Sequence, residues 1–146
     1  MKKLTFSIQI NASRQKVWEV LWNEDSYTEW TSVFGEGGSV DTDWKEGSKI
    51  AFLSATGDGM SSRIAKKIPN QYMSFLHVAE IKNGVEQPLN EESKKWSGAT
   101  ENYTLSDLKD GTKLDVDMDI TDDHEAFFRE KFPGALEKVK ELAEAG

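Results

Sequence analysis

The chain has 146 residues, of which 37% are apolar, and it contains no cysteine. Its 26 acidic residues outnumber its 18 basic ones, so the formal net charge is −8. This charge disfavours nucleic acid and anionic membranes as partners, because their phosphates repel an acidic surface. Without cysteine there are no disulfides, thiolate nucleophiles or zinc–thiolate sites. Since neither a secretion signal nor a membrane span is evident, we expect a single cytoplasmic domain over residues 1–146.

The first part of the chain predicts one strand followed by two short helices. Apolar and polar residues alternate over residues 4–10, which is typical of a half-buried strand. Over residues 14–22 the apolar residues recur at helical spacing, and Asn11 or Ser13 can cap the start of this helix. A second short helix is predicted to reach Trp30.

A meander of strands is predicted for the middle of the chain, after a glycine-rich loop at residues 35–38. The expected strands are Ser39–Asp43, Ser48–Ser54, Ser61–Ile68, Gln71–Ile81, Ser97–Leu105 and Thr112–Ile120. Asn83-Gly84 and Asp110-Gly111 favour type I′ hairpin turns, because these residues tolerate positive φ.

A long amphipathic helix is predicted to follow, capped by Asp122 or Asp123. The apolar residues on its predicted sheet-facing side are Phe128, Phe132, Leu136, Val139 and Leu142. Pro133 lacks an amide hydrogen, so we expect a kink or a restart there. The order of elements predicts an α+β helix-grip fold, in which a curved antiparallel sheet of about six or seven strands wraps around the C-terminal helix.

Five segments, spread over nearly the whole chain, carry a family resemblance. They are Ile10-Asn11-Ala12-Ser13 with Lys16–Leu21, Tyr27-Thr28-Glu29-Trp30, Trp44–Phe52, Ile68–Phe75 and Pro133-Gly134-Ala135-Leu136. In this order they resemble the START-like or SRPBCC superfamily, and within it the group related to activators of the heat-shock-ninety ATPase. Glu46 departs from the pattern, since it replaces the first glycine of that group's Gly-Gly strand. The resemblance implies a cavity between sheet and helix that binds apolar or amphipathic small molecules. It implies no single chemistry, because the superfamily includes lipid carriers, hormone receptors, cyclases and chaperone activators.

Aromatic residues dominate the candidates for lining such a cavity, although each is also compatible with ordinary core packing. The candidate ligand-binding residues are Trp22, Trp30, Phe34, Phe52, Phe75, His77, Trp96, Glu101, Tyr103, Phe128 and Phe132. His77 could orient a ligand or transfer a proton, or it could simply be hydrogen-bonded within the sheet. The strand pattern places no carboxylate beside it. If Glu101 faces an apolar interior, burial would raise its pKa and it could act as a general acid or a polar anchor.

Other motifs fail on their spacing. Asp115, Asp117 and Asp119 suggest calcium, but Ile120 occupies the position of the loop glycine, so a solvated strand face is the better interpretation. No serine lies in a nucleophile-elbow pattern, so no Ser-His-Asp set can be assembled. The loop at residues 35–38 lacks the flanking elements of a phosphate cradle and is expected at the rim of the pocket.

The leading hypothesis is therefore non-enzymatic binding of a small apolar or amphipathic molecule, with no cofactor and no metal. A first alternative is a protein-interaction module similar to the chaperone activators, with a chaperone as its partner. A second is an enzyme of the cyclase or hydrolase kind, which would use His77 or Glu101 with water. The protein is expected to be a monomer or a homodimer.

Overall fold

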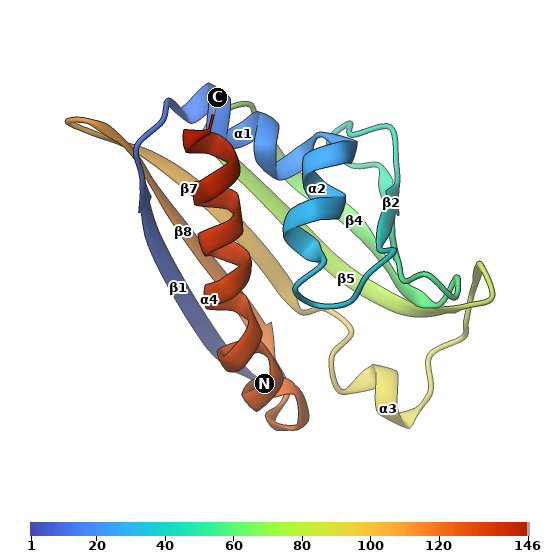
Figure 1. Cartoon of the computed structure of the whole chain (residues 1–146). Coiled ribbons are helices and arrows are strands. Elements are labelled where there is room, and N and C mark those ends of the chain that lie inside the picture. Colours follow the sequence, from blue (N-terminus) through green and yellow to red (C-terminus); the bar gives the residue numbers. More distant parts are fainter. Residues whose placement is uncertain (146) are drawn as a thin grey trace.

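The computed structural model describes residues 1–145. One curved sheet and three helices that lie on its concave side make up most of the molecule (Figure 1). The elements are β1 (Lys2–Ile10), α1 (Arg14–Trp22), α2 (Glu24–Thr31), β2 (Ser39–Asp41), β3 (Lys49–Leu53), β4 (Gly59–Ile68), β5 (Tyr72–Lys82), β6 (Val85–Glu86), α3 (Glu91–Lys94), β7 (Thr100–Leu108), β8 (Gly111–Ile120) and α4 (Asp122–Glu144). The predicted α+β helix-grip fold, with two short helices after the first strand, is confirmed.

The sheet is antiparallel and open, and its strand order is β1-β8-β7-β5-β4-β3-β2, with β6 paired to β5 off this path. β1 pairs with β8 along its whole length, from Lys2 opposite Ile120 to Ile10 opposite Thr112. This pairing brings the first strand next to the last one. The sequence patterns did not predict β6 or α3, because both are too short to show a periodicity.

α1 begins where predicted, because the Ser13 hydroxyl accepts a hydrogen bond from the amide of Lys16 at 3.2 Å. Its buried face packs against α2 and α4. The Trp30 indole of α2 donates to the carbonyl of Leu21 at 3.1 Å, which ties the two short helices together. These contacts fix α2 over one end of the concave face, beside α4 (Figure 1).

α4 lies across the concave face and packs against β1 and both short helices. Its buried residues are Phe132, Ala135, Leu136, Val139 and Ala143. Leu142, which was expected on this face, is partly exposed, and Ala143 is the buried residue of the last turn. The helix continues through Pro133, so the predicted restart does not occur.

The two predicted hairpin turns differ. Asn83 and Gly84 both have positive φ, 51° and 77°, as a type I′ turn requires. The second prediction was wrong, because the turn consists of Lys109 and Asp110, and neither has positive φ. Gly111 already belongs to β8, and a Cβ there would lie 2.2 Å from the carbonyl oxygen of Ile10. The glycine is thus needed for close packing of backbones rather than for the turn.

Two absences hold for residues 1–145. None of the helices is both long and apolar enough to cross a membrane. The same residues contain no group of three or more histidine, aspartate or glutamate side chains placed to hold a metal ion. Asp117 and Asp119 instead bind Lys3 across the outer face of the sheet, at 3.3 and 3.5 Å.

Candidate functional site

Two adjoining hollows open between the concave face of the sheet and the helices. The first, of about 290 Å³, lies among α2, the loop at residues 35–38, β3 and α4. The second, of about 400 Å³, lies among β5, β8 and the start of α4. Both are lined by Phe52, Met60, His77, Glu101 and Phe128. Because they share these residues, we treat the two hollows as one feature and call it the groove.

Most of the predicted site residues line the groove. These are Trp30, Phe34, Phe52, His77, Trp96, Glu101, Tyr103, Phe128 and Phe132. Trp22 and Phe75 do not line either hollow, because they fill the core beneath it. The ring of Trp22 meets those of Phe75 and Tyr103 edge-on, with centroids 5.4 and 5.0 Å apart. Alternation along a strand shows which residues face inward, but it does not separate a cavity wall from the packing behind it.

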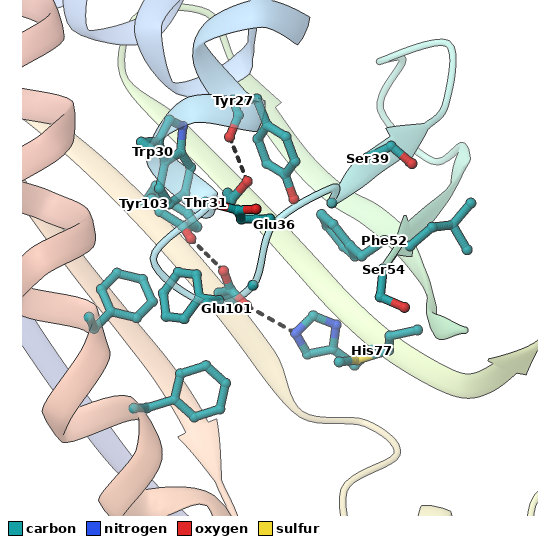
Figure 2. Close-up of a pocket in the computed structure, with 17 residues that line it drawn as sticks. Tyr27, Trp30, Thr31, Glu36, Ser39, Phe52, Ser54, His77, Glu101 and Tyr103 are labelled. Atoms are coloured by element: carbon teal, nitrogen blue, oxygen red, sulfur yellow. Dashed lines mark hydrogen bonds and ion pairs between the residues drawn. The ribbon is translucent and has the colours of Figure 1, made fainter. Parts of the chain in front are cut away.

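A chain of hydrogen bonds crosses the floor of the groove. Ser62 Oγ lies 2.7 Å from His77 Nδ1, and His77 Nε2 lies 3.3 Å from Glu101 Oε1. The Tyr103 hydroxyl donates to the other carboxylate oxygen of Glu101 at 2.5 Å. Figure 2 shows Glu101 between His77 and Tyr103, facing the hollow. Glu101 is therefore the acceptor on which the polar groups of the floor converge.

The expectation that no carboxylate lies beside His77 was wrong. β5 and β7 pair so that Phe75 is opposite Glu101. His77 follows Phe75 by two residues on β5, so its imidazole lies diagonally across from the Glu101 carboxylate. Diagonal neighbours in an antiparallel pair remain within reach of long side chains. The register of two strands far apart in sequence decided this contact, and one sequence does not reveal that register.

A β-bulge brings a second carboxylate to the groove. On β5, Ala79 pairs with Ser61 and His77 pairs with Ser62, so Val78 is left without a partner. An extra residue reverses the inward and outward alternation beyond it. Glu80 therefore lines the second hollow together with Met60, its partner on β4. Strict alternation from His77 would place Glu80 on the opposite face.

Two buried tyrosines keep their protons near neutral pH. Burial, the negative charge of Glu101 and the hydrogen bond to it raise the pKa of Tyr103 well above its ordinary value. Burial and the same carboxylate also raise the pKa of Tyr27. Tyr27 is 9% exposed, lines the first hollow, and has no hydrogen bond from its hydroxyl to the residues drawn in Figure 2. Its donor is therefore available to a ligand, and the sequence patterns did not identify it.

The Ser62–His77–Glu101 series has the composition of a hydrolytic triad but not its accessibility. Ser62 is 0% exposed and lines neither hollow. A nucleophile must reach the substrate, so this hydroxyl can only orient the imidazole. The arrangement suits recognition, because carboxylates and the Tyr27 hydroxyl are set in an aromatic wall.

Comparison with known proteins gives a consistent result. Residues 11–144 match the family described as "Activator of Hsp90 ATPase homolog 1-like protein". The solution structure of the Aha1 dimer from Colwellia psychrerythraea shares 21% identity, with a TM-score of 0.75 over 99% of this chain and 97% of that one. A crystal structure of a Mesorhizobium loti protein has 16% identity and a TM-score of 0.76, covering 99% and 98% of the two chains.

A third similar structure, from Cytophaga hutchinsonii, has 22% identity and a TM-score of 0.69, with 99% and 95% of the chains covered. At these identities the likeness to solved structures shows the shared fold. No curated protein matches the chain.

Proposed function

Since the chain belongs to the family of Activator of Hsp90 ATPase homolog 1-like proteins, we propose that it binds a small apolar or amphipathic molecule in the groove. The observation that carries this proposal is the composition of the groove wall, which combines many aromatic side chains with a few converging polar groups. Pockets for small molecules have this composition, because apolar area supplies affinity and placed polar groups fix orientation. The larger hollow, of about 400 Å³, is within the size range of small-molecule pockets.

The rigid surroundings of Glu101 support binding rather than loose packing. Tyr103 is 2% exposed and His77 is 7% exposed, so their neighbours hold both side chains in place. A carboxylate fixed in this way needs no rearrangement when a ligand arrives, which lowers the entropic cost of binding. The loop at residues 35–38 lines the first hollow and would border the ligand on its open side.

Blocking the groove tests the proposal. Met60 lines both hollows, so Met60→Trp is expected to fill the space that they share. Ala65→Trp adds the same side chain at an exposed position of the same strand and serves as the control. A titration with the neutral dye Nile red, followed by its fluorescence, should show binding to the wild type and to Ala65→Trp, and a large loss for Met60→Trp. Equal binding by both variants would place the dye elsewhere and contradict the proposal.

The natural occupant can be sought directly. Native mass spectrometry of freshly purified protein should detect a retained small molecule, and Met60→Trp purified in parallel should lack it. A molecule present in both samples would be bound outside the groove.

The family match favours a second candidate function, contact with a chaperone of the heat-shock-ninety class. It is tested by adding the protein to a purified cognate chaperone and measuring ATP hydrolysis. Stimulation that survives in Met60→Trp would separate this activity from ligand binding. No stimulation above background would remove the candidate in its direct form.

A further inference from the structure

We propose that the groove selects an organic cation, namely a protonated amine attached to an aromatic or aliphatic body. This inference rests on the proposed function and defines the ligand class of the same site. It comes from the distribution of charge around the groove, which is strongly one-sided.

Carboxylates line the groove, and the basic side chains beside them are histidines rather than lysine or arginine. Glu36 and Glu101 line the first hollow, and Glu80 and Glu101 line the second. Within residues 1–145, no lysine or arginine lines either hollow. Lys82 lies 3.7 Å from Glu80 but is itself mostly exposed. A ligand in the groove therefore meets negative charge on several sides and no fixed positive charge from lysine or arginine.

Glu101 is the carboxylate that contributes most directly to this negative charge, because both hollows share it. If the Ser62 hydroxyl donates to His77 Nδ1, then Nε2 carries the proton that is donated to Glu101. Tyr103 is a second neutral donor, because its raised pKa keeps the phenol protonated. In this arrangement neutral groups orient the carboxylate without cancelling its charge. Its side chain remains 24% exposed, so it can accept another hydrogen bond.

The aromatic side chains of the groove wall also favour a cation. Trp30, Phe52 and Phe128 present rings to the hollows. The faces of aromatic rings carry partial negative charge and attract ammonium groups. The free hydroxyl of Tyr27 lies in the same hollow, and it can hydrogen-bond a neutral polar atom of the ligand.

An anionic ligand of equal size would fit the shape of the groove but not its charge. A carboxylate inside the hollow would face Glu101 and would have no lysine or arginine to pair with. An uncompensated charge in a partly desolvated site is costly, because the lost hydration is not replaced. Fatty acids and other carboxylates are therefore expected to bind poorly.

Three probes with one ring system measure this selectivity. They are 9-(aminomethyl)anthracene, which is cationic at pH 7, neutral 9-anthracenemethanol and anionic 9-anthracenecarboxylate. Fluorescence anisotropy titrations on the wild type should give the amine at least about tenfold higher affinity than the alcohol, and the carboxylate the lowest affinity. Because the ring is constant, the differences report the polar group alone.

Four substitutions, one of them a control, locate the source of the preference. Glu101→Gln should bring the affinities for the amine and the alcohol close together, whereas Glu130→Gln, the same change at an exposed position on α4, should leave their ratio unchanged. Tyr103→Phe retains the carboxylate and should retain the preference. Glu36→Gln, in the exposed loop, should reduce it in part and provides a test that does not depend on changing the groove floor.

The outcomes separate the two proposals. If none of the three probes binds, the proposed function fails and this inference fails with it. If all three bind equally, or the carboxylate binds best, ligand binding stands and selection of a cation is wrong. A preference for the amine that is unchanged in both Glu101→Gln and Glu36→Gln would also overturn the inference.

Discussion

Phe6 on β1 and Phe132 on α4 stack face to face, with ring centroids 4.9 Å apart and planes inclined by 13°. This contact joins the edge strand to the helix that covers the sheet. Phe132 is 2% exposed, so Phe132→Ala is expected to lower the free energy of unfolding by about 3–5 kcal/mol.

Phe128, one turn earlier, is only half-buried and lines both hollows. Phe128→Ala should therefore cost less stability than Phe132→Ala and should weaken dye binding more per unit of stability lost. Urea midpoints and Nile red titrations on both variants measure the two effects. Equal losses of stability, with dye binding unaffected by Phe128→Ala, would mean that this end of the groove is ordinary core.

Two glycines should respond in opposite directions to the same substitution. Gly111→Ala forces a Cβ against the backbone of Ile10, so we expect severe destabilisation or failure to fold. Gly134→Ala lies inside α4, where the nearest atom, Val33 Cγ1, is at an ordinary 3.6 Å. It should stabilise the protein by up to about 1 kcal/mol, because alanine has the higher helix propensity. Thermal melts followed by circular dichroism test both, and a stable Gly111→Ala would contradict the close packing of β8 on Ile10.

Alkaline pH should destabilise the fold through Tyr103. Its pKa is raised in the folded state, mainly by burial and then by the charge of Glu101. Below about pH 10, the ordinary tyrosine pKa, folded and unfolded chains are both protonated and this group causes no pH dependence. Above that value the unfolded chain loses the proton while the folded chain keeps it, so stability falls with rising pH. Urea midpoints measured from about pH 8 to about pH 11 should fall less steeply for Tyr103→Phe than for the wild type.

At acidic pH the corresponding group is Asp119. Burial tends to raise its pKa, but the amide and hydroxyl of Thr100 and the nearby Lys3 outweigh this and lower it. The stability gained from the charged form is therefore present above about pH 4 and is lost as the pH falls through the lower folded value. Asp119→Asn should be less stable than the wild type at pH 7, and the difference should shrink on acidification. A constant difference across the pH range would argue against an electrostatic origin.

The sequence predicted the helices and strands better than the contacts between them. β8 shows why a single strand can be predicted, because Leu114, Val116 and Met118 alternate with aspartates and are all buried. Glu101 and His77 show the limit, since their contact depends on the pairing of β5 with β7. Glu80 shows a second limit, because a bulge at Val78 reverses the strand pattern without any sign in composition.

The order in which the elements are made gives the pairing of β1 with β8 a kinetic consequence. β1 is synthesised first among them, yet its hydrogen-bonding partner and the helix that covers its apolar face are synthesised last. At roughly 5–20 residues per second, this amphipathic strand waits for seconds with its edge unpaired. Such an edge can recruit strands from other chains. The completed fold therefore contains a strand whose safe burial depends on the speed of translation, and slowing synthesis before β8 should increase aggregation more than slowing it within α1.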